Sequence, residues 1–237
     1  MLLTSSTIKS YFYKQKLWSL ISYQPRWGLT LKGWLLTICS FTAVIIVLGF
    51  NIYSFLAPVA PIKAEALVVE GWIDDDGIKG AIAHFQQQNY QILITTGTPL
   101  GRGSYLSEYQ NFAQLTAATA VKLGFDENKI AIVPTPSRER DREAPRMRDR
   151  TLASAMAVQQ WLQQNKPQIR AINLYSKSVH GRRSWLLYRE AFNPQIEVGI
   201  ISHTPVSYDA QSWWKSSEGA RETISEAIAY IYMKFFS

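Results

Sequence analysis

Short apolar runs and longer amphipathic segments alternate along the chain from residue 66 onward. The apolar runs are typical of buried strands and cover residues 66–70, 91–96, 129–133, 170–175 and 195–201. The amphipathic segments have the period of a helix face and cover residues 78–88, 107–123, 151–164, 179–190 and 217–236. Asp74 and Thr151 are suited to cap two of these helices, and Gly124 is suited to end another. The pattern predicts an α/β fold with a mostly parallel five-stranded sheet and helices on both faces.

A charge-free stretch precedes this domain. Residues 33–62 carry no charge, and residues 33–56 are apolar over a length that spans hydrocarbon. Trp34 near one end, with Tyr53 and Phe55 near the other, suits an interfacial aromatic belt. A buried core helix and a cleaved signal peptide are the alternatives, but the run exceeds the roughly 7–15 apolar residues of a signal peptide. We therefore expect four parts, namely a basic arm (1–32), one uncleaved transmembrane helix (33–57), a linker (58–64) and an α/β domain (65–237).

The net charge of +7 belongs mostly to the amino-terminal arm. Six of the 25 basic residues lie within the first 63 positions, which contain no acidic residue, so 19 basic residues remain against all 18 acidic ones. This bias predicts an inner-membrane protein with a cytoplasmic amino terminus and an exported, periplasmic domain. The arm mixes aromatic and basic residues, which suits a segment on the membrane surface; a disordered tail is the alternative. A near-neutral domain argues against nucleic acid as a partner.

Metal and cofactor signatures are absent from the sequence. The single cysteine, Cys39, excludes an intrachain disulfide and a site of several thiolates. His84, His180 and His203 are too scattered for a recognisable metal signature. No dinucleotide fingerprint or phosphate-binding P-loop occurs at the required spacing. We therefore expect neither a metal nor a cofactor.

The turn after the fourth predicted strand carries the candidate chemistry. Ser176, Ser178, His180 and Arg183 follow this strand, and ligands of open α/β sheets bind at the carboxyl ends of strands. His180 and Arg183 are three positions apart, so a helix beginning near residue 179 directs both toward one mouth. We expect His180 to act as an acid or base and Arg183 to bind an anion. A histidine with a purely structural role is the alternative.

Two further loops are expected at the same edge of the sheet. Gly71 ends the first strand, and Thr96 and Gly97 end the second in a turn whose N–H groups suit an anion; an ordinary flexible loop is the alternative.

Residues 138–150 contain six arginines and four acidic residues. Arg148 and Arg150 lie just before a helix expected to begin at Thr151, which favours a phosphate or carboxylate. A solvated loop with mutually neutralised charges is the alternative.

A serine nucleophile is not predicted. Ser176 or Ser178, His180 and Glu108 supply the residue types of a triad, but the chain has no Gly-x-Ser-x-Gly elbow. We expect Glu108 to orient His180 instead.

Residues 64–237 resemble the bacterial envelope family that includes ElyC, SanA and YdcF. The similarity rests on Glu70-Gly71, on Thr96-Gly97 followed by Glu108, on Lys122-Leu-Gly124, and above all on the segment from Ser176 to Arg183. That segment is similar to the family's Thr-Ser-x-x-His-x-x-Arg-Ala. The resemblance implies an exported Rossmann-like domain that serves cell-envelope or peptidoglycan biogenesis, with no settled reaction.

One departure from the family pattern bears on catalysis. The family usually has Thr-x-Glu-Asn-Ala where this chain has Thr151-Leu-Ala-Ser-Ala155, so a carboxylate and an amide are missing. Two hypotheses follow. In the first, an anchored envelope protein binds an anionic ligand, such as a phosphorylated or lipid-linked glycan, and His180 transfers a proton. In the second, the domain is a non-catalytic adaptor for envelope-assembly proteins.

Overall fold

The computed structural model describes residues 21–23, 27–101, 106–136 and 147–236, and the chain divides into two compact units, residues 1–51 and 52–237. In the first unit, β1 (Ile21–Tyr23) and β2 (Trp27–Leu29) pair antiparallel. Residues 1–20 of the predicted surface arm lie outside the described residues.

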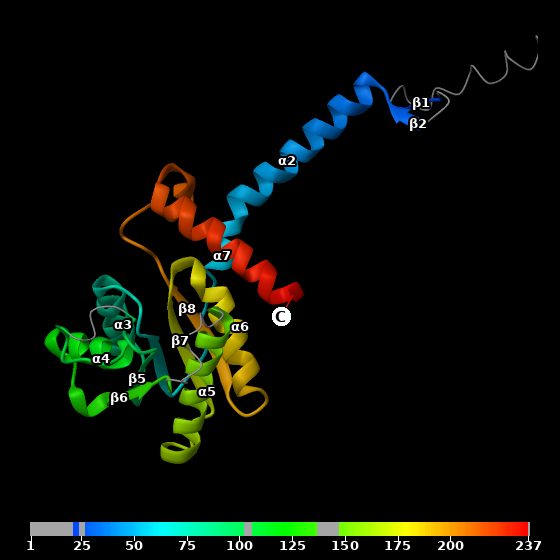
Figure 1. Cartoon of the computed structure of the whole chain (residues 1–237). Coiled ribbons are helices and arrows are strands. Elements are labelled where there is room, and N and C mark those ends of the chain that lie inside the picture. Colours follow the sequence, from blue (N-terminus) through cyan, green and yellow to red (C-terminus); the bar gives the residue numbers. More distant parts are fainter. Residues whose placement is uncertain (1–20, 24–26, 102–105, 137–146, 237) are drawn as a thin grey trace, which may run out of the picture. The chain divides into compact units, whose positions relative to one another are not determined.

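Helix α2 (Leu31–Leu56) is long and apolar enough to cross a membrane (Figure 1). Its 26 residues extend about 39 Å at 1.5 Å per residue, more than the ~30 Å of a hydrocarbon core. It begins two residues before the predicted boundary, because the Thr30 hydroxyl accepts a hydrogen bond from the Gly33 N–H and caps the first turn. Its last residues, from Ile52 to Leu56, belong to the second unit.

The second unit is built on a six-stranded sheet. The strands in chain order are β3 (Val59–Ala60), β4 (Ala66–Glu70), β5 (Ile92–Gly97), β6 (Ile130–Pro134), β7 (Ala171–Lys177) and β8 (Glu197–His203). Their order in the sheet is β3-β8-β7-β4-β5-β6, and all pairs are parallel except the β3–β8 pair. The predicted parallel five-stranded sheet is thus confirmed, with a sixth strand at one edge.

The added strand β3 lies in the segment expected to be a linker. Asn173, in the middle of β7, holds this segment with its side-chain amide, which accepts from the Ile62 N–H (2.9 Å) and donates to the Ile62 carbonyl (2.8 Å). A Cβ at Gly199 would lie 2.9 Å from the Ile62 nitrogen, so the glycine leaves room for the segment to pass. Two residues of the expected linker therefore form an edge strand, because these tertiary contacts, and not the segment's own apolar pattern, order it.

Helices cover both faces of the sheet, as predicted (Figure 1). One core cluster joins the sheet to α5 (Met147–Asn165) and α6 (Gly181–Phe192), and it includes Val68, Ile94 and Leu174. The other joins the opposite face to α3 (Asp75–Gln87) and α4 (Phe112–Lys122), and it includes Leu67 and Val69. Consecutive residues of the strands therefore face different helix layers, as the pleat requires.

The strand order creates a switch point between β4 and β7. The chain runs outward from β4 through β5 to β6, then returns through α5 to the other side of β4. At such a point the loops after the two neighbouring strands leave the sheet in opposite directions and open a crevice at their carboxyl ends. The residues that follow β4 and β7 are therefore the ones placed to bind a ligand.

The starts of α4 and α5 differ most from the prediction. Helix α4 begins at Phe112, where Asn111 accepts from the Gln114 N–H, and not near residue 107. Helix α5 begins at Met147, so Thr151 lies inside the helix and does not cap it. The predicted cap at Asp74 is confirmed, with its carboxylate accepting from the Gly77 N–H at 2.8 Å.

The carboxy-terminal part packs against the end of α2. The 3-10 helix η5 (Ala210–Lys215) leads into α7 (Ser217–Phe236), whose predicted bounds are confirmed. Tyr53 and Leu56 form a buried cluster with Val179, Tyr208 and Trp213, and α7 packs on this cluster. Helix α7 is thus held at the carboxyl edge of the sheet.

Candidate functional site

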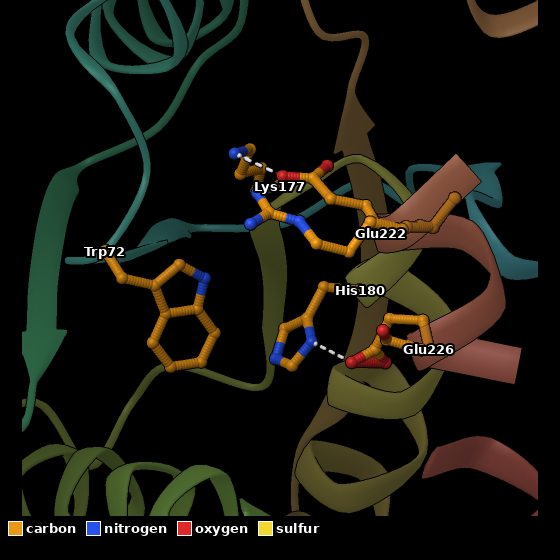
Figure 2. A pocket seen from close by; sticks show the side chains of 8 residues that line it. Trp72, Lys177, His180, Glu222 and Glu226 are labelled. Carbon is orange, nitrogen blue, oxygen red and sulfur yellow. Dashed lines mark hydrogen bonds and ion pairs between the residues drawn. The ribbon is translucent and has the colours of Figure 1, made fainter. Parts of the chain in front are cut away.

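A cavity of about 300 Å³ opens beside the end of β7 (Figure 2). The turn after β4, the turn after β7 and one side of α7 form its walls. Its lining residues are Trp72, Lys177, Val179, His180, Arg221, Glu222, Ser225 and Glu226. The cavity therefore lies at the switch point that the strand order creates.

The turn from β7 into α6 is compact and strained. The 3-10 helix η4 (Ser178–His180) connects the two elements, and Ser178 has a φ of +45°, which non-glycine residues rarely adopt. Its hydroxyl hydrogen-bonds with the hydroxyls of Tyr53 (2.9 Å) and Tyr208 (3.1 Å), which hold it in this conformation. Strain of this kind is found where neighbouring structure fixes a residue, and His180, two residues further on, lines the cavity.

His180 is bonded to a carboxylate from α7. Its Nδ1 lies 2.8 Å from Oε1 of Glu226 (Figure 2). A carboxylate only accepts, so this bond forms in the tautomer whose Nδ1 carries the proton, and Nε2 is then the ring nitrogen for proton exchange. Nη2 of Arg183 also lies 2.9 Å from Nδ1, but a guanidinium only donates and cannot bond a protonated Nδ1. The His180 side chain is 16% exposed, so the ring reaches the cavity.

Arg183 forms the third member of this cluster. Its Nε and Nη2 donate to the two oxygens of Glu226 at 3.0 and 2.8 Å, which is the bidentate geometry of a guanidinium on a carboxylate. The side chain is only 1% exposed. Arg183 therefore supports the carboxylate that positions His180, and it does not line the cavity as the sequence predicted.

These contacts fix the charge of Glu226. Burial would raise the pKa of its carboxyl, but hydrogen bonds from His180 and Arg183, together with their charges, lower this pKa to about 2. Glu226 is therefore ionised at neutral pH, and its carboxylate orients the His180 ring through Nδ1.

Trp72 forms the opposite wall. Its ring meets the His180 ring edge to face, with centroids 4.8 Å apart. Gly71 determines its position, because the Gly71 N–H donates to the Thr96 carbonyl at 2.6 Å and a Cβ at Gly71 would lie 2.7–2.8 Å from backbone atoms of Thr96 and Phe112. The backbone after β4 thus runs against its neighbours and turns Trp72 toward His180.

Polar residues line the remaining wall. Lys177 forms an ion pair with Glu222 at 3.0 Å (Figure 2), and the Tyr208 hydroxyl donates to the other oxygen of Glu222 at 3.1 Å. Burial, with the nearby charge of Glu222, raises the pKa of Tyr208 well above its ordinary value. Arg221 is exposed and forms no ion pair with any other residue that the structure describes. It leaves one uncompensated positive charge at the cavity.

A second buried polar group lies behind the cavity, at the end of β4. The hydroxyls of Ser176 and Ser184 both donate to the carboxylate of Glu70, the latter at 2.8 Å. Burial raises the pKa of Glu70, against the opposing effects of His180 and Arg183 nearby. Glu70 therefore favours its protonated form more than an exposed glutamate does.

The structure brings together only part of the predicted site. Gly71, Ser176, Ser178, His180 and Arg183 all lie in or directly behind the cavity wall. Thr96 lies behind them: it pairs with Glu70 in register and is buried, with no hydrogen-bond partner for its hydroxyl among the described residues.

The other predicted residues lie elsewhere. Glu108 is exposed in the segment before α4, not on the helix, and does not line the cavity. Arg150 is exposed on the first turn of α5, Thr151 is buried within that helix, and Gly97 packs against Phe112. The Arg148 side chain and residues 137–146 of the arginine-rich loop lie outside the described residues.

The hydrogen bonds also bear on the serine alternative. Ser178 is bonded to two tyrosines and Ser176 to Glu70, while His180 bonds to Glu226. Within the described residues neither serine is paired with the imidazole, so the site is not arranged as a serine triad.

Sequence analysis missed the residues that α7 and the turn after β4 contribute, namely Trp72, Arg221, Glu222, Ser225 and Glu226. Trp72 follows Gly71 directly after a predicted strand, so its position at the sheet edge was predictable. Glu226 carried no comparable signal, because its helix was predicted without any indication of where it docks.

No protein-family model matches the chain, and no curated protein matches it. Among solved structures the chain is similar to a probable tagatose 6 phosphate kinase from Sinorhizobium meliloti 1021, with 14% identity and a TM-score of 0.25. The match covers 70% of this chain and 44% of the kinase, so the chain spans less than half the length of that protein. A likeness this distant carries no information about what the cavity binds.

Proposed function

We propose that this protein is a membrane-anchored α/β protein whose cavity binds an anionic ligand and whose His180 exchanges a proton with it. The observation that carries the proposal is the His180–Glu226–Arg183 cluster, which opens on the cavity beside Trp72. A histidine oriented by a buried carboxylate is a common arrangement for general acid–base chemistry.

The charges around the cavity favour an anion. The Lys177 ammonium is balanced by Glu222 and the Arg183 guanidinium by Glu226, while Arg221 at the rim has no acidic partner in the described residues. A bound phosphate or carboxylate would therefore meet one guanidinium, that of Arg221, that is not already paired with a carboxylate. The flat face of Trp72 suits a sugar or another apolar surface on the same ligand.

The location and pathway belong to the same proposal. The candidate span α2 and the basic residues that precede it favour an inner-membrane anchor with a cytoplasmic amino terminus and an exported domain. The similarity of the segment from Ser176 to Arg183 to the ElyC, SanA and YdcF family supports a role in envelope biogenesis. We therefore propose a phosphorylated or lipid-linked glycan as the ligand.

The test is ligand binding by the full chain in detergent. Sugar phosphates and polyprenyl phosphates are added, and thermal unfolding is followed; a ligand at 100 times its Kd adds about 2.7 kcal/mol of stability. Arg221→Ala removes the unpaired charge without breaking an ion pair, so we expect it to weaken this effect. Arg189→Ala, on the exposed side of α6, is the matched control.

His180→Gln separates binding from chemistry. It is expected to retain ligand binding and to lose complementation of an envelope defect. Full complementation by this variant, or no stabilisation by any anionic ligand, contradicts the proposal and favours the non-catalytic adaptor.

A further inference from the structure

Helix α7 has an apolar stripe that no other described residue covers. Ile224, Ile228, Ile231 and Phe235 are 52%, 63%, 52% and 74% exposed. Their spacings of four, three and four residues place them on a single face of the helix. Glu226 lies on the other side of α7, in the buried cluster with His180. The helix is thus amphipathic, with its apolar side facing outward.

The composition of the second half of α7 suits a lipid–water interface. From residue 227 to the end of the chain there is no acidic residue, and Lys234 is the only charged side chain. Tyr232 and Phe236 are exposed beside the stripe, at 46% and 71%, whereas Tyr230 packs against the buried cluster at the end of α2. Aromatic residues are enriched at the level of lipid headgroups, and the absence of acidic residues removes repulsion from anionic lipids.

The last turn of α2 attaches α7 to a segment that belongs at a membrane surface. Leu56 is fully buried in the cluster that α7 covers, and the rings of Phe55 and Tyr230 meet edge to face with centroids 5.2 Å apart. The Arg182 guanidinium, from α6, lies 4.1 Å from the centre of the same Phe55 ring. Residues that end a spanning helix lie at the interface, so α7 is held beside the bilayer if α2 crosses it.

We propose that the apolar stripe of α7 lies in the interfacial layer of the bilayer that α2 enters. The stripe is about 17 Å long at 1.5 Å per residue and one helix wide. That is small for a stable protein–protein interface, which buries about 800 Å² per partner, but it is the footprint of an interfacial helix. The inference rests on α2 as a span and does not depend on the ligand proposed above.

If α7 lies in the membrane interface, the cavity lies close to the membrane surface. Arg221, Glu222 and Ser225 line it from the same helix, and helix diameters are about 10 Å. The cavity is then held within roughly one helix diameter of the headgroups.

Site-directed spin labelling of the full chain tests the proposal. In a Cys39→Ser background, single cysteines are placed at Ile228 and Ile231 on the stripe and at Met156, which is 52% exposed on α5. The labelled protein is reconstituted into nanodiscs of phosphatidylethanolamine and phosphatidylglycerol. Collision rates with oxygen, which partitions into lipid, and with a water-soluble nickel complex are then compared.

We expect labels at Ile228 and Ile231 to collide several-fold more often with oxygen, relative to nickel, than the label at Met156. Stripe labels with the same ratio as Met156 would place the stripe in water and overturn the proposal. Low collision rates with both reagents, with dipolar broadening between labels, would show a second copy on the stripe and also overturn it. Ile224→Cys, at the other end of the stripe, provides an independent reading if either variant fails to fold.

Discussion

Nδ1 of His180 and Oε1 of Glu226 lie 2.8 Å apart, although the two residues are 46 positions apart in the chain. One belongs to the turn that ends β7 and the other to the middle of the last helix. Arg183, in the first turn of α6, donates hydrogen bonds to both oxygens of the same carboxylate. The orientation of the imidazole is therefore set by the docking of α7.

Glu226→Gln is expected to change the acid dependence of stability. The pKa of Glu226 is about 2 in the folded chain against the ordinary 4.5, so its ionised form stabilises the fold above pH 4.5. This contribution is lost as the pH falls from about 4.5 toward 2. The free energy of unfolding of the native chain should therefore fall more steeply over that range than that of the variant.

Denaturant unfolding of the detergent-solubilised chain at about pH 6 and about pH 3 measures this difference. Glu197→Gln, at an exposed position, is the control. Parallel pH profiles for the native chain and Glu226→Gln would contradict the assignment.

Glu70→Gln is expected to act in the opposite sense. Burial raises the pKa of Glu70, so the ionised carboxylate costs stability above the ordinary pKa of 4.5, and this cost grows until the pH passes the folded pKa. An amide that keeps the shape and accepts from Ser176 or Ser184 removes that cost. The variant should be at least as stable as the native chain at neutral pH, by thermal unfolding, and should lose its advantage at about pH 4. A large loss of stability at neutral pH would show that the charge is needed.

Gly71→Ala is expected to destabilise the domain. The new Cβ would approach backbone atoms of Thr96 and Phe112 within 2.7–2.8 Å, and backbone cannot move aside as a flexible side chain does. Overpacking of this kind costs about 1–3 kcal/mol. Gly101→Ala is the matched control, because a Cβ there has no neighbour within 4 Å. Equal thermal stabilities for the two variants would refute the explanation.

Trp72→Ala is expected to weaken ligand binding. Its ring forms the cavity wall opposite His180. An aromatic contact contributes about 0.5–1.5 kcal/mol beyond area burial, which corresponds to a roughly two- to tenfold change in Kd. Titration calorimetry with the anionic ligand measures this, and Trp214→Ala, which does not line the cavity, is the control. An unchanged Kd for Trp72→Ala would exclude the ring from the binding surface.

Local pattern was sufficient to predict most elements of the domain. The strand β4 and the helix α7 have their predicted bounds, because each has a clear apolar pattern and Gly71 directly follows β4. The strand β3 was missed, since its two residues form a strand only by pairing with the edge strand β8. The hydrogen bond between Asn173 and Ile62, just after β3, fixes this pairing. The start of α4 was wrong because the capping side chain of Asn111, and not the apolar pattern, decides it.

The sequence by itself determined the class of fold, the apolar span and the position of His180 after a parallel strand, because these depend on periodicity and on the rule that strand ends share one edge. Only the tertiary structure decided which groups face His180. It brought Glu226 and Trp72 to the cavity, left Glu108 and Arg150 exposed away from it, and buried Arg183. The physical reason is that a helix pattern specifies which face is apolar, whereas the partner of each polar residue depends on how separate elements pack.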